Sequence, residues 1–238
     1  MADRGITFSA AMVRALLEGR KTQTRRLLSP QPVWEPEVVD GFTFAAGWAV
    51  EKLGLSSWRD SDEFREHLRP LVRHQPGDRL YVREHWKVDA CYDAVAPRDL
   101  LTLGTDEPLS GWDHALCYLA TAPAESLRDP VWGRHRQAMH MPRWASRLTL
   151  LVTDVRVQRL GDMSEADAMA EGIYAVGGRN GWTFDAENWF ASPKIAFHRL
   201  WDSLHTDPGT RWEDNPFIYA ASFDVRRGNI DEKIGGGA

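Results

Sequence analysis

A helix stop followed at once by an extended, cationic segment is the feature that most constrains how this chain folds. Ser9 is a candidate helix N-cap, and Gly19 is the residue type that most readily ends a helix in the left-handed conformation. The apolar residues between them follow the i, i+3, i+4 spacing of one buried face: Val13, Leu16 and Leu17. The sequence therefore predicts a short helix over residues 9–19 and an extended arm over residues 21–28.

The arm places a lysine and a threonine hydroxyl three residues apart, at Lys21 and Thr24. A lysine held beside a hydroxyl can act as its base, provided that burial favours the neutral amine and the nitrogen points at the oxygen. In a flat strand the two side chains would lie on opposite faces, so a catalytic role requires a bend or bulge between them. The alternative is that both residues cap the helix end or face water.

A strand with a carboxylate on its apolar face is predicted over residues 79–86, after a Pro-Gly-Asp turn. One face of this strand carries Leu80, Val82, Glu84 and Trp86. A carboxylate buried there must be paired, because an unpartnered charge would cost several kcal/mol. Lys21 or Arg25 is the expected partner, and Glu84 serves either as a structural ion pair or as a ligand-orienting group.

The second half of the chain predicts a long strand over residues 147–160 and a helix that Ser164 begins and Gly172 ends. Asp167 stands three residues after Ser164, as in a capping box. A third helix begins at Ser192-Pro193, and its spacing predicts a packing face that consists of Phe197, Leu200, Trp201 and Leu204. The last predicted strand covers residues 217–225.

Composition limits the classes of function. The 238 residues carry a net charge of −5, whereas a protein that coats nucleic acid needs a strong excess of lysine and arginine. Any contact with nucleic acid must therefore be confined to small basic clusters. Arg20 and Arg25 belong to one such cluster, and Arg143 belongs to another. Trp86 and Trp144 are expected either to stack on a base or to pack in the core.

The two cysteines, Cys91 and Cys117, lie outside any CxxC pattern, so neither a disulfide scaffold nor a structural zinc site is expected. We expect no metal and no cofactor. The chain shows no apolar run of membrane-spanning length and no signal peptide, which predicts a cytoplasmic protein without a membrane partner.

Four blocks of the sequence resemble the ASCH-domain family of the PUA-like superfamily, especially its phage and prophage members. These blocks are GRKTQTR at residues 19–25, PGDRLYVRE at 76–84, HMPRWASR at 140–147 and NPFIY at 215–219. The resemblance implies an α+β fold in which a small β-barrel carries flanking helices at its mouth. It also implies a positively lined pocket suited to RNA or a nucleobase.

One branch of that family, the bacterial N4-acetylcytidine amidohydrolases, carries a similar Gly-Arg-Lys-Thr-x-Thr segment. Its catalytic lysine and threonine fall on Lys21 and Thr24, and its glutamate falls on Glu171 in the predicted helix that begins at Ser164. The resemblance implies hydrolysis of N4-acylated cytosine nucleosides, with Arg20, Arg25, Glu84, Trp86, Arg143 and Trp144 as candidate substrate-binding residues. The alternative is a non-catalytic module that binds single-stranded RNA or a modified base.

The expected organisation is one domain over residues 1–228. Segments of irregular pattern, read as insertions packed on the barrel, cover residues 31–70 and 90–111. Residues 229–238, which end in a glycine-rich run, are expected to be a disordered tail.

Overall fold

The computed structural model of this chain has a mixed α+β architecture with few helices. The residues that it describes are 2–31, 34–39, 42–47, 68–100, 116–177 and 181–232. They fall into two compact units. Unit 1 draws on the segments Met1–Thr22, Gly77–Val152 and Phe223–Ala238, and unit 2 draws on Gln23–Pro76 and Thr153–Ser222.

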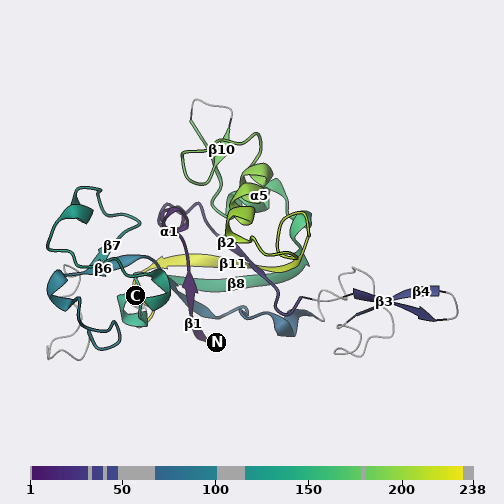
Figure 1. Cartoon of the computed structure of the whole chain (residues 1–238), viewed down its shortest axis with the longest axis horizontal. Helices are drawn as coiled ribbons and strands as arrows, with labels where there is room; N and C mark the ends of the chain where they lie inside the picture. The colour runs from purple at the N-terminus through teal and green to yellow at the C-terminus, as the bar shows by residue number, and fades with distance from the viewer. Residues whose placement is uncertain are drawn as a thin grey trace, which may run out of the picture. The chain divides into compact units, whose positions relative to one another are not determined.

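The principal sheet has the strand order β1-β5-β8-β11-β2. Its strands are β1 (Asp3–Thr7), β5 (Arg79–Arg83), β8 (Leu148–Arg159), β11 (Phe217–Arg227) and β2 (Gln23–Leu27). β1 pairs with β5 in parallel, whereas β5 pairs with β8 and β11 pairs with β2 in antiparallel fashion. The neighbours β8 and β11 are the two long strands of Figure 1, which confirms the long strand and the final strand expected from the sequence.

In unit 1, helix α1 (Ala10–Leu17) confirms the predicted helix and its stop. Gly19 has a φ of +73°, a left-handed conformation that glycine adopts without steric cost. The backbone N–H of Lys21 donates to the carbonyl of Ala15 at 3.1 Å, which fixes the start of the arm against the last turn of α1. Ser9 occupies the N-cap position, but its side chain makes no capping hydrogen bond.

The strand expected over residues 79–86 is interrupted. β5 ends at Arg83, and Trp86 begins a separate strand, β6 (Trp86–Val88), which pairs with β7 (Leu116–Tyr118). The predicted alternation nevertheless holds across the break, because the residues on the apolar face are each 0–1% exposed: Leu80, Val82, Glu84 and Trp86. The alternation of side chains along the strand therefore determined which residues are buried. Pairing of β6 with β7 determined where the chain leaves the principal sheet.

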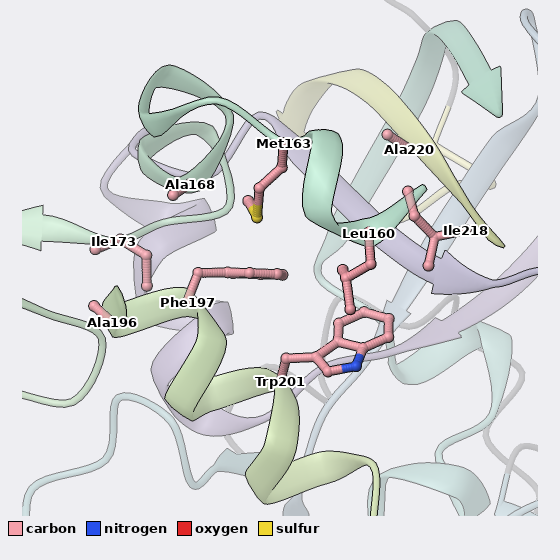
Figure 2. Packing of buried hydrophobic residues seen from close by; sticks show 9 residues of the cluster. All are labelled: Leu160, Met163, Ala168, Ile173, Ala196, Phe197, Trp201, Ile218 and Ala220. Atoms are coloured by element: carbon pink, nitrogen blue, oxygen red, sulfur yellow. The ribbon is translucent and has the colours of Figure 1, made fainter. Parts of the chain in front are cut away.

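In unit 2, two helices pack on a core of buried residues (Figure 2). Helix α4 (Glu165–Ala170) starts with the predicted capping box between Ser164 and Asp167, and helix α5 (Pro193–Leu204) starts with the expected Ser192 cap. The rings of Phe197 and Trp201 point from α5 into this core. The core consists of Leu160, Met163, Ala168, Ile173, Ala196, Phe197, Trp201, Ile218 and Ala220.

The expected packing face of α5 is wrong at its last position. The side chain of Leu204 is 65% exposed, whereas Ala196 is fully buried. Leu204 is the last residue of the helix, and it lies beyond the turn that contacts the core. An i, i+7 spacing predicts a shared face but not how far along the helix the core extends.

The remaining elements lie outside the principal sheet. An antiparallel hairpin of β3 (Trp34–Val39) and β4 (Phe42–Gly47) lies within the segment 31–70, which was expected to be irregular. β9 (Tyr174–Ala175) pairs with β10 (Trp182–Thr183). The 3-10 helices are Arg69–Leu71, Ala90–Tyr92, Ser126–Arg128, Ala138–His140, Arg143–Ala145 and Leu160–Asp162. Of the expected insertions and tail, residues 32–33, 40–41, 48–67, 101–111 and 233–238 lie outside the described residues. Residues 229–232 of the expected tail are described, and Ile230 there is buried, at 1% exposure. Among the helices of the described ranges, none has the length and apolar character needed to cross a bilayer.

We expect Phe197→Ala to lower the free energy of unfolding by about 3–5 kcal/mol, because it removes a buried aromatic ring and leaves a cavity. Leu204→Ala in the same helix is the matched control, and its effect should stay within about 0.5 kcal/mol. Urea denaturation followed by circular dichroism measures both. Equal losses for the two variants would show that the packing face of α5 is misassigned.

Candidate functional site

Lys21, in unit 1, is almost completely buried, with 1% of its surface exposed. Its Nζ lies 5.4 Å from the centre of the Phe8 ring, within the range of a cation–π contact. A lysine is rarely buried to this extent unless it is paired or functional. The residue chosen as a candidate base from the sequence thus has the burial that such a role requires.

Glu84, also in unit 1, is held by a bidentate ion pair with Arg147. Arg147 Nε donates to one carboxylate oxygen at 2.8 Å, and Nη2 donates to the other at 2.9 Å. The guanidinium also lies 4.1 Å above the ring of Tyr118. Burial raises the pKa of Glu84, and the hydrogen bonds from Arg147 oppose that rise. The ion-pair alternative for Glu84 is therefore present, with Arg147 rather than Arg25 as the partner.

The other cationic candidates of unit 1 are engaged with acidic residues. Arg143 donates from Nη2 to Asp3 at 2.7 Å and from Nε to Asp231 at 2.8 Å. Arg20 donates from Nε to Glu18 at 2.7 Å. Their charges are largely balanced within the protein, which leaves less positive charge for a ligand than the sequence indicated.

The two candidate stacking residues, Trp86 and Trp144, pack against each other. Trp86 is 0% exposed in a core cluster with Met141 and Ala145, and Trp144 contacts its ring edge-to-face at a centroid distance of 6.2 Å. The guanidinium of Arg136 lies 5.6 Å from the Trp86 ring. Trp86 thus fills a core position, which was one of the two alternatives considered for it.

In unit 2, Thr24, Arg25 and Glu171 are all buried, at 3%, 4% and 4% exposure. Thr24 and Arg25 are consecutive residues of β2, and Glu171 is the C-cap of α4. Arg25 Nη1 donates to Glu171 Oε1 at 3.1 Å. Glu171 is therefore not a surface residue at a helix end, and Arg25 pairs with the helix α4 rather than with Glu84.

The same guanidinium reaches a second carboxylate of α4. Arg25 Nη2 lies 3.1 Å from Asp167 Oδ1, and Arg156 from β8 forms an ion pair with that oxygen. We call Arg25, Asp167, Glu171 and Arg156 the Arg25 network. Burial alone would raise the pKa of Asp167, but the backbone N–H of Ser164 and the two arginines outweigh it and lower the pKa to about 2.

Sequence reasoning missed two members of this network as ionic partners, Asp167 and Arg156. Asp167 was identified only as the acidic residue of a capping box, a role that it does fulfil. A signal was present, since Asp167 and Glu171 stand four residues apart and so share one helix face, where two like charges call for a cation. No residue near Asp167 and Glu171 in the sequence indicated that the cation would be Arg25.

No cluster of three or more histidine, cysteine or acidic side chains that could hold a metal ion occurs among the residues that the structure describes. Nδ1 of the half-buried His85 lies 2.6 Å from Nε2 of the exposed His135. Such a pair offers two ligands, one fewer than even an open catalytic zinc site uses. Cys91 is exposed and Cys117 is buried, and both are free thiols.

Comparison of the chain with protein-family models, with curated proteins and with solved structures gave no match.

We expect Glu84→Gln to lower the free energy of unfolding by about 1–3 kcal/mol, because it leaves the Arg147 guanidinium without its counter-charge. Asp231→Asn is the control, since it breaks an exposed pair with Arg143 and should cost less than about 1 kcal/mol. Chemical denaturation of both variants measures the difference. If Glu84→Gln unfolds like the wild type, the ion pair contributes nothing to stability.

Proposed function

We propose that this protein is an amidohydrolase that removes the acyl group from N4-acylated cytosine nucleosides, as a member of the ASCH-domain family with the small barrel typical of it. The observation that carries the proposal is the burial of Lys21, a lysine placed directly after the helix stop. Lysines that serve as general bases in enzymes are typically buried ones. Thr24 and Glu171 are likewise polar residues with buried side chains.

Each of the three residues has a defined role in the proposed reaction. Lys21 takes the proton of the Thr24 hydroxyl, and the threonine oxygen attacks the carbonyl carbon of the exocyclic amide. The C–N bond then breaks, Glu171 relays to the departing cytosine amine the proton that Lys21 took from Thr24, and the acyl group remains on Thr24. Water hydrolyses this ester, which releases the carboxylic acid and restores the hydroxyl.

A neutral nucleoside suits this chain better than a phosphate backbone does. Arg25, Arg143 and Arg147 each pair with carboxylates of the protein, so their charges are already compensated. The chain as a whole carries a net charge of −5. A protein that binds RNA through several phosphates would instead present uncompensated cations. The proposed substrate is therefore a modified nucleoside or nucleobase in the cytoplasm.

We expect replacement of Lys21 or Thr24 to abolish deacylation of acetylcytidine. Because Lys21 is buried, the test uses Lys21→Met, which keeps most of the aliphatic stem and removes the base. Thr24→Ser should keep partial activity and Thr24→Val should have none, since only the hydroxyl attacks. Release of cytidine, followed by liquid chromatography, measures turnover, and thermal melting checks the fold. Normal turnover by folded Lys21→Met or Thr24→Val would remove the corresponding role.

Salt dependence separates the enzyme from an RNA-binding module. For a nucleoside pocket we expect the KM for acetylcytidine to change less than about threefold between 50 and 200 mM salt, a range over which a multi-phosphate contact loses roughly a thousandfold in affinity. The measurement compares acetylcytidine with a short cytidine-containing RNA at both salt concentrations. If the protein binds RNA tightly, with a steep salt dependence, and does not turn over the nucleoside, the amidohydrolase proposal is wrong and the RNA-binding module is the better assignment.

A further inference from the structure

The fully buried guanidinium of Arg25 links the two carboxylates of helix α4. Asp167 and Glu171 lie one helical turn apart, where two negative charges on the same face repel each other. The Arg25 side chain is 0% exposed, and its Nη1 and Nη2 lie 3.1 Å from Glu171 Oε1 and Asp167 Oδ1. A single planar fork thus compensates both charges and fixes the direction of one Glu171 oxygen.

Arg25 is itself anchored. Its Nη1 also donates to Gln23 Oε1 at 3.3 Å, and its partner Asp167 is held by the backbone N–H of Ser164 at 3.0 Å. Asp167 further accepts from Arg156, which comes from β8. Contacts therefore run from the capping box to Glu171. Ser164 holds Asp167, Asp167 forms an ion pair with Arg25, and Arg25 donates to Glu171.

We propose that Arg25 is a positioning residue that aims the Glu171 carboxylate at the departing amine, a role that rests on the proposed function. The Arg25 side chain has no exposed surface with which to contact a substrate, and its Nη1 donates to Glu171 and Gln23. Its Nη2 lies 3.1 Å from Asp167 Oδ1 as an ion pair without hydrogen-bond geometry. It acts through Glu171. This assignment replaces the substrate-binding role expected from the basic cluster in the sequence.

The identity of the residue matters because a lysine cannot reproduce the contact. Arginine presents several N–H donors in a rigid plane, whereas a lysine ammonium is a point charge on a flexible stem. Arg25→Lys keeps the charge, whereas Arg25→Ala would leave the buried carboxylate of Glu171 and the half-buried carboxylate of Asp167 without this cation. Arg25→Lys should still loosen Glu171, and a misplacement on the order of 1 Å can cost about 100-fold in rate.

The test is a double-mutant cycle with acetylcytidine as substrate. We expect Arg25→Lys to lower kcat by about 10- to 100-fold and to change KM by less than about threefold. In the Glu171→Gln background the same substitution should cost less than about twofold more, because the group that Arg25 positions is already lost. Asp167→Asn, which loosens Arg25 without altering Glu171, should lower kcat in the same direction and provides a second route if Arg25→Lys does not fold.

Arg211→Lys is the matched control, because Arg211 pairs with Glu213 outside the Arg25 network and its side chain is 48% exposed. Its kcat should stay within about twofold of the wild type. A raised KM with unchanged kcat for Arg25→Lys, or a full additional loss in the Glu171→Gln background, would overturn the positioning role. An equal loss in Arg211→Lys would also overturn it, by showing a general structural effect. Absence of wild-type turnover would overturn the proposed function and this inference together, before any variant is compared.

Discussion

The arrangement of unit 2 around helix α4 depends on one buried cation. Helix α4 has six residues, too few to be stable by itself, and it is held at both ends. Ser164 and Asp167 satisfy its first backbone groups, and Arg25 binds the carboxylate of its C-cap, Glu171. The ion pair with Glu171 joins positions 146 residues apart in the sequence, so β2 and α4 are fixed to each other by charge as well as by packing.

Unit 1 contains an independent arrangement of the same kind. Glu84 stands where the strand alternation demands an apolar residue, and Arg147, 63 positions later, balances its charge. Stacking on Tyr118 orients the guanidinium for bidentate contact. In both units an ion pair with an arginine offsets the desolvation cost of a buried carboxylate. In both, the arginine and the carboxylate come from segments that are distant in the sequence. Such pairs specify how segments meet more than they add to stability.

These pairs shape the proposed chemistry. Arg25, Arg143 and Arg147 are paired with carboxylates of the protein, and this pairing is the reason for proposing a neutral nucleoside rather than a phosphate backbone as the ligand. What the chain buries are groups suited to proton transfer and nucleophilic attack: a lysine, a threonine hydroxyl and a glutamate. Polar groups of this kind are costly to bury, and enzymes accept that cost where the groups do chemistry.

The sequence by itself determined the local features. Gly19 ended α1, Ser164 and Asp167 formed a capping box, and the period-two pattern placed Glu84 on the buried face. Each of these depends on residues within a few positions of one another, so spacing and side-chain type were sufficient. The position after the helix stop also indicated Lys21 as a candidate base, and the structure shows this lysine to be buried.

Only the tertiary structure decided which charges meet. Arg25 pairs with Asp167 and Glu171, and Glu84 pairs with Arg147, because strand pairing and helix packing bring those segments together. The same long-range contacts ended β5 at Arg83. Electrostatic partners depend on distance in space, and a sequence of 238 residues with 29 lysines and arginines and 34 acidic residues offers many pairings that spacing cannot distinguish.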